Sequence, residues 1–327
     1  MMDMHSTKEM PSHKCFPFCR AKSSSSSSSS MNINEPIKLF CSLNSDIERL
    51  NTSLAGDSIS LKWCSEAINL LRKMHSHFLL FFEKFHISVL WDGTDILDEY
   101  MKQTLDLLDL CNSLKSAISG MQRYRLMVEF AAGKLRNGGN ISDATTKITE
   151  IERLLSESQK IYGVEKWRDT NLFKTDMLKT KSKDSNICFI YAITSSMRLV
   201  GMLLFSALLY PISITMDKEV YWVSPQLKSF SVSIGKLVGC FLKVLEGVKD
   251  KSRPILVENK VIEKTVLDIK AQVLKGKAVD QEKLINLLKQ SSLVLKEGME
   301  MFESVVDELF EEVVKGRNEV LAMVDVN

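Results

Sequence analysis

Residues that break helices are scarce in this chain. Proline occurs 6 times and glycine 14 times in 327 residues, which is below the average usage of both. No clear run of alternating apolar and polar residues bounded by turn residues predicts a strand. Together with abundant Leu, Lys, Glu and Met, this scarcity predicts an all-α protein. We expect an elongated multi-helix bundle with long helices and a disordered N-terminal tail.

Histidine is also scarce, and none of the 5 histidines lies beyond His86. The C-terminal half therefore has few candidate general bases. The contiguous motifs of P-loop, dinucleotide-binding, zinc-protease and serine-hydrolase sites are absent, although a triad assembled from distant residues stays open. We interpret His75, His77 and His86 as packed or exposed histidines rather than ligands. The expectation is a protein that is not an enzyme, with no catalytic residue, cofactor or metal.

The chain has no marked excess of charge of either sign, because it contains 43 Lys and Arg residues and 41 Asp and Glu residues. A net charge near +2 gives no electrostatic basis for binding nucleic acid. The first 20 residues lack the apolar core of a cleavable signal peptide. The odd set of seven scattered cysteines predicts reduced thiols in a reducing compartment. We expect a cytoplasmic or membrane-associated protein, with a plastid location as the alternative suggested by the Ser-rich start.

Composition divides the chain into four parts. Residues 1–34 form the expected disordered tail, which contains the unbroken serine run Ser23–Ser30. Residues 35–162 form an N-terminal helical region, 163–185 a mobile polar linker, and 186–327 a C-terminal helical region. Within the tail, Cys15 and Cys19 stand among aromatic and basic residues. They are candidates for lipidation, and two ordinary free thiols are the alternative.

The longest apolar run, 187–210, begins the C-terminal region and contains 24 residues. As a helix it would be about 36 Å long, enough to cross a bilayer core of about 30 Å. Arg198 lies at its middle, where it would cost about 2.5–3.5 kcal/mol in a membrane. The run is therefore either a membrane span or a buried bundle helix. In a bundle, we expect Arg198 to pair with a carboxylate from the 95–109 helix or from the acidic last helix.

Apolar residues recur at helical spacing through most of the remaining chain. The expected helices cover about 35–54, 58–87, 94–135, 142–162, 224–249, 253–276 and 280–324.

The last expected helix carries a run of acidic residues with no Lys or Arg between Lys296 and Lys315. Two interpretations are open: a docking face for a basic partner protein, or an ordinary solvated helix face. The candidate docking residues are Glu300, Glu303, Asp307, Glu308 and Glu311, flanked by Glu297 and Glu312.

One segment near the middle of the N-terminal region resembles a known family. Its phrases are Leu90-Trp91-Asp92, Leu97-Asp98-Glu99-Tyr100-Met101 and Leu107-Leu108-Asp109-Leu110-Cys111-Asn112-Ser113-Leu114. They resemble the signature region of the plant BYPASS family and, more distantly, its exocyst-interacting ROH relatives. Phe16-Pro17-Phe18 and the order of parts over roughly 35–325 are similar too.

The resemblance implies a non-enzymatic plant protein in developmental signalling. Such a protein would restrain a root-derived mobile signal that otherwise stops shoot growth, or act in growth and stress responses. The alternative is a membrane-associated trafficking adaptor that engages exocyst-like machinery, with membrane contact through 187–210. A third, weaker hypothesis is an enzyme or carrier with an apolar pocket beside the central helix. The partners expected under the first two are other proteins.

Overall fold

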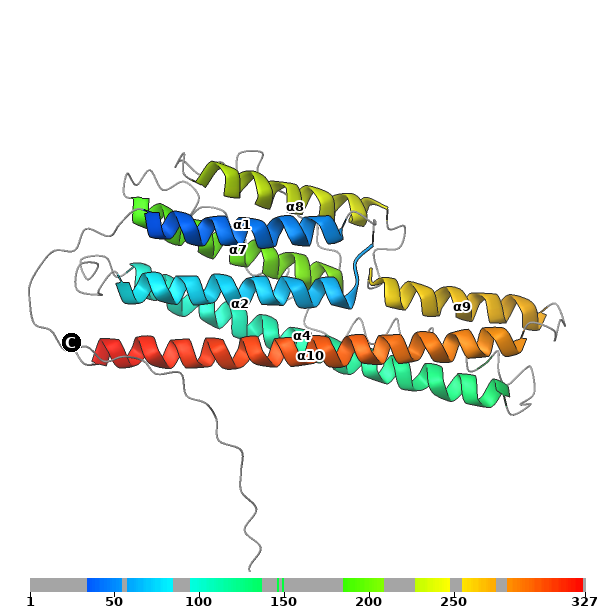
Figure 1. Cartoon of the computed structure of the whole chain (residues 1–327). Helices are drawn as coiled ribbons and strands as arrows, with labels where there is room; N and C mark the ends of the chain where they lie inside the picture. The colour runs from blue at the N-terminus through cyan, green and yellow to red at the C-terminus, as the bar shows by residue number, and fades with distance from the viewer. Residues whose placement is uncertain are drawn as a thin grey trace, which may run out of the picture.

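The computed structural model describes residues 34–54, 58–84, 95–136, 185–208, 227–247, 255–274 and 281–325, and also residues 146 and 149. These residues form helices, and the all-α prediction is confirmed (Figure 1). The helices are α1 (Asn34–Ser53), α2 (Leu61–Lys84), α4 (Asp95–Arg136), α7 (Ser185–Leu208), α8 (Lys228–Glu246), α9 (Val257–Leu274) and α10 (Gln281–Asp325).

The two longest helices, α4 and α10, run antiparallel along the molecule (Figure 1). With 42 and 45 residues, they are about 63 and 68 Å long. Along one part of this pair, α2 and α7 pack on it and α1 and α8 cover them; we call this part the six-helix end. Along the other part, α9 is the only helix with described bounds that joins the pair, and we call this the three-helix end (Figure 1).

Polar contacts fix the outer layer of the six-helix end. The indole Nε1 of Trp63 donates to the carbonyl oxygen of Leu50 at 3.2 Å, which joins α2 to α1. The amide of Asn51 donates to the carbonyl oxygen of Ser233 at 3.3 Å, which joins α1 to α8. Both contacts use buried donors that would otherwise lose their water partners.

The start of α2 lies where the two ends meet. The backbone N–H of Val257 donates to the carbonyl of Ile59 at 2.8 Å, as part of an isolated bridge between Ile59 and Leu256. Ser60 then caps the helix, since its Oγ accepts from the N–H of Trp63 at 3.2 Å. The expected start at residue 58 was wrong, because the backbone of Ile59 pairs with a segment almost 200 residues away.

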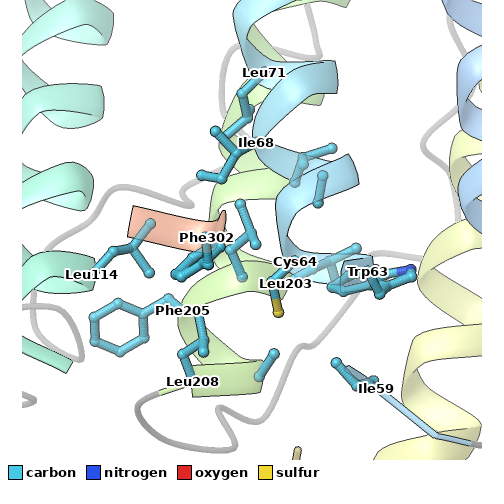
Figure 2. Packing of buried hydrophobic residues seen from close by; sticks show 14 of the residues in the cluster. Ile59, Trp63, Cys64, Ile68, Leu71, Leu114, Leu203, Phe205, Leu208 and Phe302 are labelled. Carbon is cyan, nitrogen blue, oxygen red and sulfur yellow. The ribbon is translucent and has the colours of Figure 1, made fainter. Parts of the chain in front are cut away.

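The apolar helix α7 lies inside the bundle. Of the window Phe189–Leu208, which is long and apolar enough to cross a membrane by length and composition, 78% is buried within the protein. Figure 2 shows Leu203, Phe205 and Leu208 of α7 meeting Cys64 and other side chains of α2, α4 and α10. The protein interior therefore accounts for the apolar composition of this helix.

Several sequence predictions fall outside the described residues. They are the disordered tail with Cys15 and Cys19, the polar linker 163–185 up to Asp184, and most of the expected helix 142–162. Among the described residues, Cys41, Cys64, Cys111 and Cys240 are free thiols. The division of the chain into four parts, with three boundaries between them, stays a prediction.

Candidate functional site

Arg198 of α7 forms an ion pair with Glu99 of α4. Its Nη2 lies 2.5 Å from Glu99 Oε1, and the two side chains are 11% and 6% exposed. Glu99 belongs to the 95–109 segment in which a carboxylate partner was expected. Helices α7 and α4 can approach closely here because Gly201 has no side chain. A Cβ at this position would lie only 3.2 Å from the Cδ2 of Leu110.

Burial of this pair is electrostatically costly. Burial raises the pKa of Glu99, and the nearby Arg198 only partly opposes the effect. Further along the same helix, burial raises the pKa of Asp106 to about 6, and its Oδ2 has no hydrogen-bond partner. At the interface between α4 and α7, Arg198 therefore lies near two carboxyl groups that resist ionisation, and Lys102 of α4 also lowers the pKa of both.

A second polar contact lies on another side of α4. The hydroxyl of Tyr100 lies 3.4 Å from His75 Nε2 of α2, and both residues are almost completely buried. Burial lowers the pKa of His75 to about 4, so this imidazole is neutral at physiological pH. At Gly316 of α10, a Cβ would lie 2.9 Å from the Tyr100 hydroxyl and 3.0 Å from His75 Cε1. Only glycine leaves room for these two rings.

Arg317, the next residue of α10, completes this arrangement. Its Nη1 donates to the carbonyl oxygen of Met101 and to Thr104 Oγ1, both at 2.6 Å. Glu99, Tyr100, Met101 and Thr104 thus connect α4 to α7, α2 and α10. The described part of the family-like segment 90–114 therefore holds four helices, α2, α4, α7 and α10, in fixed positions relative to one another.

Six acidic residues of α10 are exposed or half-buried, and we call them the acidic crest: Glu300, Glu303, Asp307, Glu308, Glu311 and Glu312. On the α2 flank, Arg72 pairs with Glu308 and, at 2.5 Å, with Glu312. On the α4 flank, Lys115 lies 2.6 Å from Asp307. Asp307, Glu308 and Glu312 are nevertheless 50%, 48% and 42% exposed. Their carboxylates are held in place while still facing solvent.

The other candidate docking residues have weaker contacts. Glu303 accepts a hydrogen bond from Gln122 of α4 at 3.3 Å. Glu300 is 62% exposed and lies 3.7 Å from Lys296 of its own helix. Glu311 is exposed and forms no ion pair with a described residue. The crest of α10 therefore keeps Glu300 and Glu311 available without cost to any tertiary contact.

Beyond this crest, a shallow groove of about 540 Å³ lies along the last turns of α10. Its described lining combines apolar Phe310, Val314 and Ala322 with polar Asn318, acidic Glu311 and Glu319, and basic Lys315. The Nζ of Lys315 lies 3.8 Å from Glu319 Oε1. Within the described ranges, no group of three or more His, Cys, Asp or Glu side chains could hold a metal ion.

Some contacts were not predicted from the sequence. His75 was expected only to be packed or exposed, and Tyr100 was noted only as part of the family-like phrases. Gly316 and Arg317 were not singled out. The sequence feature that could have indicated these contacts is Gly316, a glycine inside the long last helix that is followed directly by Arg317. A glycine at such a position indicates close approach of a neighbouring group.

The fold and the site together define an all-α, elongated helix-bundle protein with an acidic helix on its surface. Over 119 residues it is 24% identical to UPF0496 protein 4 of Oryza sativa subsp. indica, and equally to the protein of the same name from Oryza sativa subsp. japonica. The match covers 36% of this chain and only 26% of each rice protein. No family model and no solved structure matches the chain. The similarity is thus to plant proteins.

Proposed function

We propose that this is a non-enzymatic interaction protein that binds a basic segment of a partner protein along the acidic crest of α10. The observation that carries the proposal is the combination of exposure and fixed position at Asp307, Glu308 and Glu312. Carboxylates held by Lys115 and Arg72 lose less conformational entropy on binding than free side chains do. Exposed charge also speeds association with an oppositely charged partner.

Plant developmental signalling is the setting that we propose for this binding. The support is the resemblance of 90–114 to the BYPASS family, together with the similarity to the rice proteins. In this account the protein restrains a root-derived mobile signal, or acts in growth or stress responses, through protein contacts. The docking surface would then lie on the part of α10 that packs on α2 and α4.

Charge reversal on the crest tests this function. The double variant Glu300→Lys/Glu311→Lys changes two side chains that form no ion pair with another described helix. Partners captured from plant extract by the wild type should be lost at least tenfold with this variant, and the wild-type interaction should weaken with added salt. Glu282→Lys/Glu297→Lys, at exposed sites on the same helix, is the matched control. Equal capture by all three proteins would contradict the proposal.

A membrane-associated trafficking adaptor is the second candidate function. It is favoured by the length and composition of Phe189–Leu208, which would allow membrane contact if α7 left the bundle. Carbonate extraction of membranes from cells that express the tagged chain separates the two functions. Wild-type protein that resists extraction, and captures tethering components, would favour the adaptor. Protein that is washed off would favour α7 as a core helix.

A further inference from the structure

The groove on the last turns of α10 has two chemical properties. Its apolar lining comes from Phe310, Val314 and Ala322. Its charged lining is acidic on balance, because Glu311 and Glu319 outnumber Lys315, which pairs with Glu319 and leaves Glu311 without a cation among the lining residues. The side chains of Phe310 and Val314 are four residues apart, so they lie about 6 Å apart along the helix axis. A segment that fills this groove needs apolar side chains at a similar spacing and positive charge beside them.

Such a segment exists near the start of this chain. Residues 14–22 read Lys-Cys-Phe-Pro-Phe-Cys-Arg-Ala-Lys, and no Asp or Glu occurs between Met10 and Asn34. Pro17 disfavours helical backbone at the preceding residue. In extended backbone, Phe16 and Phe18 point to the same side, about 6.6 Å apart. Both the apolar spacing and the sign of the charge therefore match the groove.

The connection between the two sites is long enough. Asp46 of α1 pairs with Lys73 of the antiparallel α2, and the adjacent Arg72 is level with Glu312 of α10. Helix α1 starts at Asn34, twelve residues before Asp46. This start is therefore level with the last turns of α10, at the same end of the molecule (Figure 1). The 12 residues from Lys22 to Asn34 have a root-mean-square span of about 20 Å and a maximum of about 40 Å.

We propose that the basic aromatic segment 14–22 of this same chain docks in the groove formed by Phe310, Val314 and Ala322. Phe16 and Phe18 contact the apolar lining, and Lys14, Arg20 and Lys22 lie beside the carboxylates of Glu311 and Glu319. Because Glu311 belongs to the acidic crest as well, the docked segment competes with a basic partner there. This regulation rests on the proposed function, whereas the docking itself does not.

Disulfide mapping tests the docking in the full-length chain. Cys15 and Cys19 flank the two phenylalanines, so a cysteine introduced with Asn318→Cys, an exposed groove residue, can capture them. Oxidation by glutathione disulfide joins the two thiols and releases two molecules of glutathione. The matched control is Lys228→Cys, which is exposed on α8 close to the start of α1, where Phe40 contacts Phe230. The natural exposed thiol of Cys41 serves as an internal reference in both proteins.

A docked segment should crosslink to position 318 at least tenfold faster than to position 228. Adding Phe16→Ser/Phe18→Ser should abolish this difference, and Glu311→Lys should reduce it several-fold at low salt. Equal rates at positions 318 and 228, or a difference that survives Phe16→Ser/Phe18→Ser, would overturn the docking. Loss of partner capture in Glu300→Lys/Glu311→Lys is measured in a separate experiment. Failure of the docking of segment 14–22 can therefore be distinguished from failure of the proposed binding of a basic partner.

Discussion

α10 passes through two different environments along its length. From about Gly298 to Val320 it packs on α2 and α4, beneath the layers formed by α7, α1 and α8. From Gln281 to about Glu297 its described neighbours are α9 and the last turns of α4. Among the described helices, α10 therefore belongs to a six-helix bundle at one end and to a three-helix bundle at the other.

The two ends differ in what they bury and what they expose. At the six-helix end, the ion pair of Arg198 and Glu99 and the contacts of Tyr100 and Arg317 hold the helices together. Most exposed large apolar side chains of the described residues lie at or beside the three-helix end: Leu126, Phe130, Val261, Leu267, Leu287, Leu293, Val294 and Met301. Few layers and exposed apolar surface indicate lower local stability. We infer that the six-helix end is the rigid part of the molecule.

The largest effect is expected when the buried ion pair is broken at the six-helix end. Glu99→Leu removes the carboxylate that pairs with the buried Arg198 guanidinium, which should lower the free energy of unfolding by about 3–5 kcal/mol. Adding Arg198→Met removes the buried charge as well and should restore most of that loss. Urea unfolding of the three proteins measures both steps. Lys236→Met, which removes an exposed partner of Glu48, should cost less than about 1 kcal/mol; a similar cost for Glu99→Leu would contradict the account.

The next effect concerns the close packing at Gly316. A methyl group there meets Leu79, Tyr100 and His75 at once, so Gly316→Ala should destabilise the protein by about 1–3 kcal/mol. Gly235→Ala on α8 is the matched control, because a Cβ at that position meets nothing within 4 Å. It should stabilise the protein by about 0.5–1 kcal/mol through helix propensity. Thermal unfolding measures the change in stability of both variants relative to the wild type, and the two changes must have opposite signs.

A pH-dependent effect is expected at Asp106. Its folded pKa of about 6 lies above the unfolded value of 3.8, so the folded state binds more protons between these values. Stability from this group therefore falls as pH rises through 6. Asp106→Asn should be more stable than the wild type at pH 7.5 by about 1–2 kcal/mol, after allowance for the partial exposure of the group. The two proteins should converge near pH 4.

The buried His75 contributes with the opposite sign. Its folded pKa of about 4 lies below the unfolded 6.5, so its contribution is lost as pH falls between those values. The difference between the Asp106→Asn and wild-type curves, measured by urea unfolding, isolates the carboxyl group from this background. A variant that is less stable than the wild type at pH 7.5 would show that ionised Asp106 supports Arg198 instead.

The smallest effect on stability is expected at the three-helix end. Leu287→Gln/Val294→Gln replaces two side chains that are 47% and 48% exposed, and each change should alter the free energy of unfolding by no more than about 0.5 kcal/mol. The same pair of changes at buried Leu288 and Leu295 should unfold this end. Chemical unfolding measures the contrast, and a large loss from the exposed pair would show that those side chains are covered in solution.

Much of the fold followed from local sequence properties. Scarce breakers and apolar spacing indicated the long helices, and the 45-residue α10 was expected to within a few residues at each end. The central Arg198 indicated a nearby carboxylate because an isolated buried charge is too costly. These predictions depend on short-range periodicity and on one strong energetic rule.

The remaining contacts depend on residues far apart in sequence. Ile59 meets Leu256, and Gly316 meets His75 and Tyr100, only after the helices have packed. No local pattern states which helices become neighbours. For the same reason, the acidic run of α10 did not reveal that Arg72 and Lys115 would hold three of its carboxylates.

Native-state hydrogen exchange along α10 tests the contrast between its two halves most directly. The account predicts that amides near Phe302, Val306 and Leu309 exchange only through global unfolding. Amides near Leu288, Ser292 and Leu295 should exchange through local opening with a clearly smaller free energy and little dependence on denaturant. Equal opening free energies along the whole helix would contradict a rigid six-helix end and a weaker three-helix end.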